Sequence, residues 1–166
     1  MDRMIRTMTM EDIESVLEIY NDAILNTTAL YRTEPETLEE KQRWFLENVK
    51  ENNPMYIYEE NGEVIGFATF KRFYPNEGYK FSMEHSVYVS SKHQGKGVGK
   101  QLFQKLIEEA KKRKVRTLIA VIDSENVGSI KLHEQFGFHL VGRLKHIGYK
   151  FGKWLDIVHY QLDLYE

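Results

Sequence analysis

The stretch that decides the fold is HQGKGVGKQL, residues 93–102, where three glycines alternate with other residues directly before an apolar helical pattern. Gly95, Gly97 and Gly99 allow backbone conformations that a Cβ atom would resist, and they let a ligand approach the main chain closely. A helix that begins here directs unpaired N–H groups and the positive end of its dipole outward. The stretch therefore predicts a loop that binds an anion at the start of a helix.

The composition limits the classes of protein to which the chain can belong. Its 166 residues, 42% of them hydrophobic, predict a single domain over residues 1–166 with a core of its own. A formal net charge of −2 lacks the basic surplus of a typical nucleic-acid-binding protein, so we expect no nucleic-acid partner. The absence of cysteine excludes disulfides and thiolate metal sites. No apolar run has the length of a signal peptide core or a membrane span, so we expect a cytoplasmic protein with no membrane partner.

Helix and strand signals alternate along the chain. The capping box TLEE at 37–40 starts a helix, and Asn61-Gly62 joins two strand patterns as a hairpin. A further strand at 83–89 leads straight into the glycine loop, and an amphipathic helix follows it. The expected order is strand, helix, helix, three strands, glycine loop, helix, strand, helix and two strands. This order indicates an α+β, or mixed α/β, domain.

Two well-known phosphate-binding loops do not fit the glycine stretch. A P-loop requires G-x-x-x-x-G-K-[ST], but Gln94 stands at its first glycine and Gln101 at its hydroxyl position. The dinucleotide fingerprint G-x-G-x-x-G requires a further glycine and meets Lys100 or Leu102, depending on where it starts. These mismatches argue against nucleotide hydrolysis and against nicotinamide cofactors.

The pattern that remains is Q-x-x-G-x-G at residues 94–99, between a strand and an amphipathic helix. It resembles the acyl-CoA pyrophosphate loop of the GCN5-related N-acetyltransferases (GNAT). The resemblance extends to a later helix that begins with Asn126, carries Ser129 and His133 three and seven positions on, and closes with Gly137-Phe138. It implies the GNAT fold, a mixed and mostly antiparallel sheet that is splayed near the cofactor and flanked by helices. It also implies acetyl-CoA as co-substrate.

Longer segments are similar to the phosphinothricin acetyltransferase family, which includes enzymes that acetylate methionine sulfoximine and methionine sulfone. These segments are IYNDAILNTTA (19–29), TEPETLEE (33–40), EHSVYV (84–89), SIKLHEQFGF (129–138) and GYKFGKWLDIV (148–158). The resemblance implies direct acetyl transfer, in a ternary complex, to the α-amine of a small amino-acid analogue. It also implies a homodimer. The stretch FKRFYPNEGYKF at 70–81 departs from the family, which leaves the choice of substrate open.

The resemblance also implies the catalytic residues. Glu84 stands at the position of the general base, which acts directly or through water, because the amine must be neutral to attack. His133 stands where many superfamily members have a tyrosine beside the CoA sulfur, and histidine can lend a proton near neutral pH. Glu84 and His133 can instead share the role of base. Strand alternation places His85 on the opposite face from Glu84, where it is structural or contributes to the amine pocket.

Further residues are expected around the two substrates. The expected cofactor-binding residues are Val87, Tyr88, Val89, Gln94, Gly95, Lys96, Gly97, Val98, Gly99, Lys100, Asn126 and Ser129. Lys96 and Lys100 either pair with the phosphates or remain solvated. A substrate carboxylate requires a cation, and Arg72 is the nearest candidate in the variable stretch, with Tyr74 in the pocket wall. The six histidines show no metal-binding spacing, so we expect no metal.

Two other functions stay open on the sequence. One is an acetyltransferase for another amine, such as a protein N-terminus or a polyamine. The other is a non-catalytic regulatory domain that binds acyl-CoA, against which the presence of both Glu84 and His133 argues.

Overall fold

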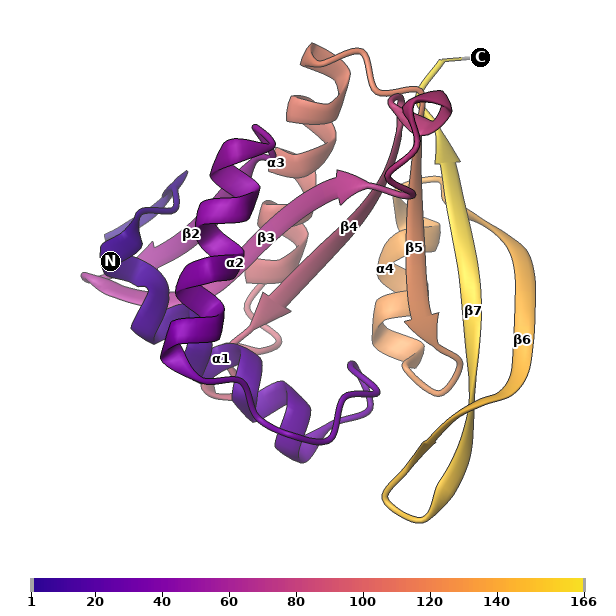
Figure 1. Ribbon diagram of the computed structural model, residues 1–166, viewed down its shortest axis with the longest axis horizontal. Helices are drawn as coiled ribbons and strands as arrows, with labels where there is room; N and C mark the ends of the chain where they lie inside the picture. Colours follow the sequence, from indigo (N-terminus) through magenta and orange to yellow (C-terminus); the bar gives the residue numbers. More distant parts are fainter. Residues whose placement is uncertain (1, 166) are drawn as a thin grey trace.

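The computed structural model describes residues 2–165, which form one seven-stranded sheet with helices on both of its faces (Figure 1). The helices are α1 (Ile13–Asn26), α2 (Leu38–Lys50), α3 (Val98–Lys112) and α4 (Val127–Gln135). The strands are β1 (Arg3–Thr7), β2 (Met55–Glu60), β3 (Glu63–Arg72), β4 (Ser82–Val89), β5 (Thr117–Asp123), β6 (His139–Lys150) and β7 (Lys153–Asp163). Their order in the sheet is β1-β2-β3-β4-β5-β7-β6. The predicted order of elements and the α+β class are confirmed.

The junction between β4 and β5 differs from every other strand pair in the sheet. All other neighbours are antiparallel, whereas β4 and β5 run parallel because α3 crosses between them. Their pairing ends at Glu84 opposite Ile119, although β4 continues to Val89 and β5 to Asp123. Beyond Glu84 the two strands diverge (Figure 1). The later residues of β4 therefore have no strand partner on this side, and the predicted splay of the sheet is confirmed.

Each face of the sheet has its own apolar core. In Figure 1, α1 and α2 lie in front of the sheet, and α3 and α4 lie behind it. The front core joins α1 and α2 to β2 and β3 through Ile13, Val16, Ile19, Phe45, Met55, Ile57 and Phe67. The rear core centres on α3 and includes Val98, Leu102, Phe103, Leu106, Phe70, Leu118, Ala120 and Phe138. Because helices cover both faces, β3 and β4 lie between two helical layers.

Short-range signals account for several element boundaries. Thr37 Oγ1 accepts a hydrogen bond from the Glu40 amide at 3.1 Å, and Glu40 Oε1 accepts one from the Thr37 amide at 3.2 Å. This is the predicted capping box, and α2 begins directly after it. Asn61 and Gly62 have φ values of 51° and 82°, as a tight turn between β2 and β3 requires. Among the described residues, no helix is long and apolar enough to cross a membrane.

Candidate active site

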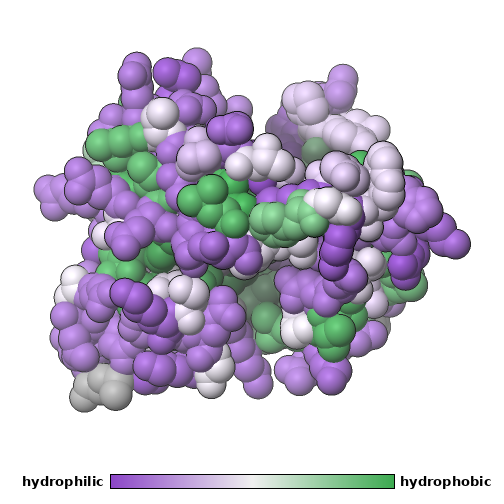
Figure 2. All heavy atoms as spheres, turned by 90° about the horizontal axis from the view of Figure 1, so that it is seen from below, coloured by the Kyte–Doolittle hydropathy of each residue, from purple (hydrophilic) through white to green (hydrophobic). Residues whose placement is uncertain are grey.

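Two adjoining cavities lie where β4 and β5 diverge. The α2-side pocket has a volume of about 600 Å³ and lies between the front face of the sheet and α2. The loop-side groove has a volume of about 680 Å³ and runs past the glycine loop and the start of α4. The residues that line both are Ala29, His85, Ser86, Tyr88, Val121 and Asp123. Figure 2 looks at this end of the molecule and shows a hollow with hydrophobic residues around it.

The glycine loop forms one wall of the loop-side groove. Gly95 and Gly97 have φ values of 79° and 81°, in the left-handed region that disfavours a side chain, and Gly97 precedes the first residue of α3. Gly99 lies inside the first turn of α3, where a Cβ atom would meet Val89 at an ordinary 3.5 Å. The groove therefore faces the N-terminus of a fifteen-residue helix, as an anion requires.

Most of the expected cofactor residues line this groove. Those brought together are Val87, Tyr88, Val89, Gln94, Gly95, Gly97, Val98, Gly99, Lys100, Asn126 and Ser129. Lys96 does not line it, whereas Lys131, which the sequence reasoning missed, does. Asn126 also caps α4, since its Oδ1 accepts a hydrogen bond from the Ser129 amide at 3.1 Å. The groove thus combines free strand backbone, a helix N-terminus and lysine side chains.

Glu84 and His85 face opposite sides of β4, as strand alternation predicts. Glu84 is half-buried in the α2-side pocket, where it makes no hydrogen bond or ion pair with any described residue. His85 is only 7% exposed, and its ring packs edge-on against Phe103 and Phe138 at 5.0 and 5.5 Å between centroids. The carboxylate is therefore available to a ligand, while the imidazole belongs to the rear core.

His85 and His133 form a buried hydrogen-bonded pair. Their Nε2 atoms lie 2.8 Å apart, and His133 Nδ1 lies 2.7 Å from the carbonyl oxygen of Ser129. A carbonyl only accepts, so His133 carries its proton on Nδ1, and the Nε2 of a neutral His133 has a lone pair. The proton between the rings then belongs to His85 Nε2, by assignment from this network. Both nitrogens of His133 are thus occupied within the protein.

Burial keeps both imidazoles neutral. Burial, together with a smaller contribution from the neighbouring His133, lowers the pKa of His85 to about 3. Burial also lowers the pKa of His133, although its hydrogen bond to the Ser129 carbonyl acts in the opposite direction. At neutral pH the pair is therefore uncharged, and His133 has no free N–H to offer to a ligand in the groove.

The structure does not support the assignment of Arg72 and Tyr74 to the substrate pocket, because neither lines either cavity. Arg72 follows Lys71 on β3 and so projects from the opposite face of the strand. Its Nη1 donates to the Pro75 carbonyl at 3.0 Å and lies 3.6 Å from Glu77 Oε2. Tyr74 is 50% exposed and packs against neighbouring aromatic rings of the same segment. The cation that β3 presents to the pocket is instead Lys71.

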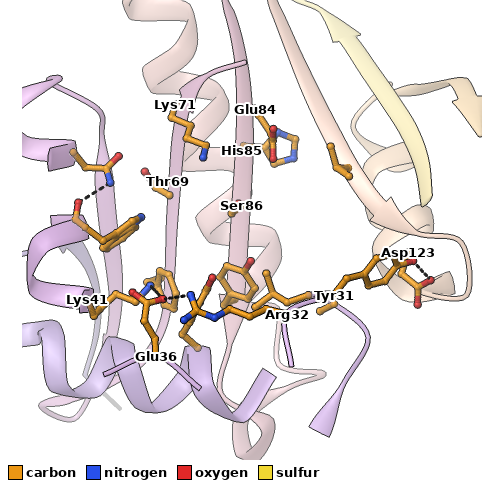
Figure 3. Close-up of a pocket in the computed structure, with 18 of the residues that line it drawn as sticks. Tyr31, Arg32, Glu36, Lys41, Thr69, Lys71, Glu84, His85, Ser86 and Asp123 are labelled. Atoms are coloured by element: carbon orange, nitrogen blue, oxygen red, sulfur yellow. Dashed lines mark hydrogen bonds and ion pairs between the residues drawn. The ribbon is translucent and has the colours of Figure 1, made fainter. Parts of the chain in front are cut away.

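Other polar residues of the α2-side pocket were also missed by the sequence reasoning. They include Arg32, Glu36, Lys41, Thr69 and Ser86 (Figure 3). Their positions follow from packing between segments that are distant in sequence. Ser86 could have been predicted from the sequence, however, because it shares a strand face with Glu84 two residues earlier.

The segment between α1 and α2 closes the pocket by binding to the other half of the sheet. The hydroxyl of Thr28 donates to Asp123 at the end of β5, and the hydroxyl of Tyr31 lies 2.8 Å from Asp123 Oδ1. Burial and the adjacent Asp123 carboxylate raise the pKa of Tyr31, so this hydroxyl keeps its proton. These contacts hold residues 28–31 across the gap between β4 and β5.

A second set of contacts ties the same segment to β6. Lys150 is buried, and its Nζ donates to the carbonyls of Thr27 and Leu30 at 2.8 and 2.6 Å. The ring of Tyr31 lies so close to Gly148 that a Cβ atom there would stand 2.3 Å from it. The absence of a side chain at 148 is therefore a condition of this closure.

Comparison with known proteins identifies the family. The model of the acetyltransferase (GNAT) family matches residues 14–138, and the chain belongs to this family. It is 40% identical to the L-methionine sulfoximine/L-methionine sulfone acetyltransferase of Pseudomonas aeruginosa, over 99% of this chain and 96% of that protein.

Two solved structures share the fold over nearly the whole chain. The first is a phosphinothricin acetyltransferase from Sinorhizobium meliloti in complex with AcCoA, with a TM-score of 0.95, 34% identity, and coverage of 99% of this chain and 89% of that one. The second is a ribosomal-protein-alanine N-acetyltransferase from Brucella melitensis, with a TM-score of 0.94, 42% identity, and coverage of 97% and 99%. The family is thus established, whereas the names of these relatives differ in the acceptor amine.

Proposed function

We propose that this chain transfers the acetyl group of acetyl-CoA to the α-amine of a small amino-acid analogue, with methionine sulfoximine, methionine sulfone and phosphinothricin as the leading candidates. The observation that carries the proposal is that the two cavities adjoin and share six lining residues. A pocket with an unpaired carboxylate, Glu84, adjoins the groove of the glycine loop where β4 and β5 diverge. The names of the Pseudomonas and Sinorhizobium relatives support this choice of acceptor.

The groove has the chemistry to hold acetyl-CoA. The N-terminus of α3 and the loop amides face the groove, and Lys100 and Lys131 line it, which suits a pyrophosphate. The backbone of Val87, Tyr88 and Val89, free on its β5 side, can pair with the extended pantetheine arm as a strand would. Acetyl-CoA supplies the thioester, and these residues bind and align it.

Glu84 is the proposed general base. An alkyl amine is mostly protonated near neutral pH, so it must lose a proton before it attacks the thioester carbon. Glu84 accepts this proton directly or through water. The new C–N bond then forms as the C–S bond breaks, the sulfur leaves as a thiolate, and the acylated nitrogen releases its second proton to give the neutral amide. His85 closes the other side of β4 and takes no part in this first proton transfer.

The departing thiolate needs a proton, and we assign its protonation to His133. His133 lines the loop-side groove, as the glycine loop does. Because His133 is neutral and its Nε2 accepts from His85, Nε2 has to leave this hydrogen bond and take up a proton before it can act as a donor. The second proton of the acylated nitrogen supplies it, and His133 then passes it to the thiolate. The alternative is a base role that His133 shares with Glu84.

The proposal is tested by the release of CoA from acetyl-CoA across a panel of amines, followed with a thiol reagent. The chain has no cysteine, so the protein itself adds no background signal. We expect saturable turnover with methionine sulfoximine, methionine sulfone or phosphinothricin. Turnover only with an alanine-initiated peptide, as the name of the Brucella relative suggests, or only with spermidine, would move the acceptor to another amine. Tight binding of acetyl-CoA without turnover on any amine would indicate a regulatory domain.

We further propose that the chain is a homodimeric, single-domain protein of the cytoplasm, where acetyl-CoA is available. The hairpin of β6 and β7 supports the dimer, because it exposes large apolar side chains that solvent disfavours. These side chains are Leu140, Val141, Leu144, Ile147, Tyr149, Phe151 and Trp154. Light scattering after gel filtration measures the mass directly. We expect twice 19.7 kDa for the wild type and a monomer for Trp154→Glu, since this residue is 65% exposed in the single chain.

A further inference from the structure

The floor of the α2-side pocket is a ladder of residue pairs from two antiparallel strands. Alternate side chains of β3 and β4 face the pocket, and the register places them directly opposite one another. The pairs are Phe67 with Tyr88, Thr69 with Ser86, and Lys71 with Glu84. The ladder thus passes from aromatic through hydroxyl to charged side chains. Figure 3 shows Lys71 and Glu84 at the same end of the pocket, on neighbouring strands.

The other cations of the pocket already have partners. Glu36 Oε2 lies 3.3 Å from Arg32 Nη1 and 3.4 Å from Lys41 Nζ. Lys41 is 1% exposed, and its Nζ lies 3.5 Å from the centre of the Tyr20 ring. Arg32 also donates to the carbonyl of Glu34. Both cations are therefore committed to the packing of α1 and α2.

Lys71 and Glu84 differ from these residues because they are unpaired. Neither makes a hydrogen bond or an ion pair with any described residue, and they do not pair with each other. Lys71 is exposed at the mouth of the pocket, and Glu84 is half-buried. Directly opposite residues of an antiparallel pair have Cβ atoms about 4.5–5.5 Å apart. Two opposite charges this close, at the rim of a cavity, can be bridged by a ligand that carries the complementary charges.

An α-amino acid carries such a pair of charges on a single carbon atom. Its amine has to reach Glu84 for the proposed proton transfer, which leaves the carboxylate on the neighbouring side of the same carbon. Lys71 occupies that side, across the strand pair from Glu84. A simple amine lacks the second charge and leaves Lys71 without a partner.

We propose that Lys71 binds the α-carboxylate of the acceptor and, with Glu84, selects substrates whose amine and carboxylate share one carbon. This inference rests on the proposed function and specifies its substrate class. Lys71 is a binding residue, and it takes no part in the transfer of the acetyl group. Its removal should therefore raise KM for the amino acid and leave the KM for acetyl-CoA unchanged.

The test uses the full chain and two acceptors that differ only in the carboxylate. These are methionine sulfone and its decarboxylated form, 3-(methylsulfonyl)propan-1-amine. For Lys71→Met we expect kcat/KM for methionine sulfone to fall about tenfold to a hundredfold, the usual range for a lost hydrogen bond to a charged group. The kcat/KM for the amine without a carboxylate should stay within about twofold of the wild-type value. Lys71→Arg should recover most of the kcat/KM that Lys71→Met loses with methionine sulfone.

Lys80→Met is the matched control. Lys80 is an exposed lysine of the adjoining segment, its Nζ lies 3.7 Å from Glu77 Oε1, and it lines neither cavity. The substitution Lys80→Met removes the same charge from the chain as Lys71→Met does. Both acceptors should react with this variant as they do with the wild type. Equal melting temperatures for the variants would show that folding is intact.

The outcomes separate the inference from the proposed function. If Lys71→Met slows both acceptors equally, or neither, Lys71 does not recognise the carboxylate and the inference is wrong while the function stands. If the wild type acetylates the simple amine and no amino-acid analogue, the proposed function fails, and the inference fails with it. A loss confined to methionine sulfone supports both.

Discussion

Strand β4 carries ionisable side chains on both faces, and the two faces offer them opposite environments. On the front face, Glu84 lies in an open pocket without a hydrogen-bond partner among the described residues. On the rear face, His85 is buried against aromatic rings and shares a proton with His133 at 2.8 Å. Adjacent residues on one strand thus belong to different parts of the protein. The front face is free to react with a ligand, whereas on the rear face the buried His85 contributes mainly to stability.

The largest expected effect is on the front face. Glu84→Gln keeps the size of the side chain and removes its ability to accept a proton, so we expect kcat to fall by about 10²- to 10⁴-fold. Binding of acetyl-CoA, measured by calorimetry, should remain as in the wild type because Glu84 does not line the loop-side groove. Stability should change by less than about 0.5 kcal/mol. Full turnover of this variant would show that another group is the base.

The second effect concerns the rear face and should appear in stability. His85→Ala leaves a cavity beside Phe103 and removes the donor to His133 Nε2. We expect a loss of about 2–4 kcal/mol in the free energy of unfolding, from the cavity and the unsatisfied nitrogen together. Urea denaturation measures it. If His85→Ala lowers the free energy of unfolding as little as Glu84→Gln is expected to, the stabilising role of His85 on the rear face is wrong.

The third effect is the dependence of stability on pH. The folded state lowers the pKa of His85 to about 3, and the unfolded chain has the ordinary value near 6.5. Below pH 6.5 the unfolded state therefore binds the additional proton, so stability is complete above this pH and is lost as the pH falls toward 3. For this one group the slope approaches about 1.4 kcal/mol per pH unit.

His85→Gln tests this slope, since glutamine can donate to His133 but does not titrate. We expect the variant to lose part of the decline in stability between pH 6.5 and 4.5, measured by urea denaturation at several pH values. The ring of His133 stacks on His85, and its own lowered pKa leaves a slope of the same sign in the variant. His139→Gln, an exposed histidine of β6, is the control. An unchanged slope for His85→Gln would indicate that folding does not lower the pKa of His85.

The smallest effect concerns the segment at residues 28–31 that closes the gap between β4 and β5. Tyr31→Phe removes the hydroxyl that reaches Asp123, so we expect a loss of about 0.5–1.5 kcal/mol in the free energy of unfolding. KM for the acceptor should rise, because Tyr31 also lines the α2-side pocket. Thermal melting and steady-state kinetics measure the two effects. An unchanged KM would show that this hydroxyl does not shape the pocket.

The sequence by itself determined those features that depend on neighbours a few residues apart. The capping box of Thr37, the turn at Asn61-Gly62 and the left-handed glycines of the loop each rest on short-range geometry, and the structure reproduces them. Strand alternation likewise places Glu84 and His85 on opposite faces. These signals also sufficed for the family, because its motifs lie on a loop and a helix start.

Only the tertiary structure decided which distant residues meet. His85 and His133 are 48 positions apart, and Tyr31 and Asp123 are 92 apart. The choice between Arg72 and Lys71 depended on which face of β3 looks into the pocket, and this follows from the register with β4 and the packing of α2. Contacts of this kind depend on how strands pair and helices pack across the whole chain, and no local pattern of residues encodes that arrangement.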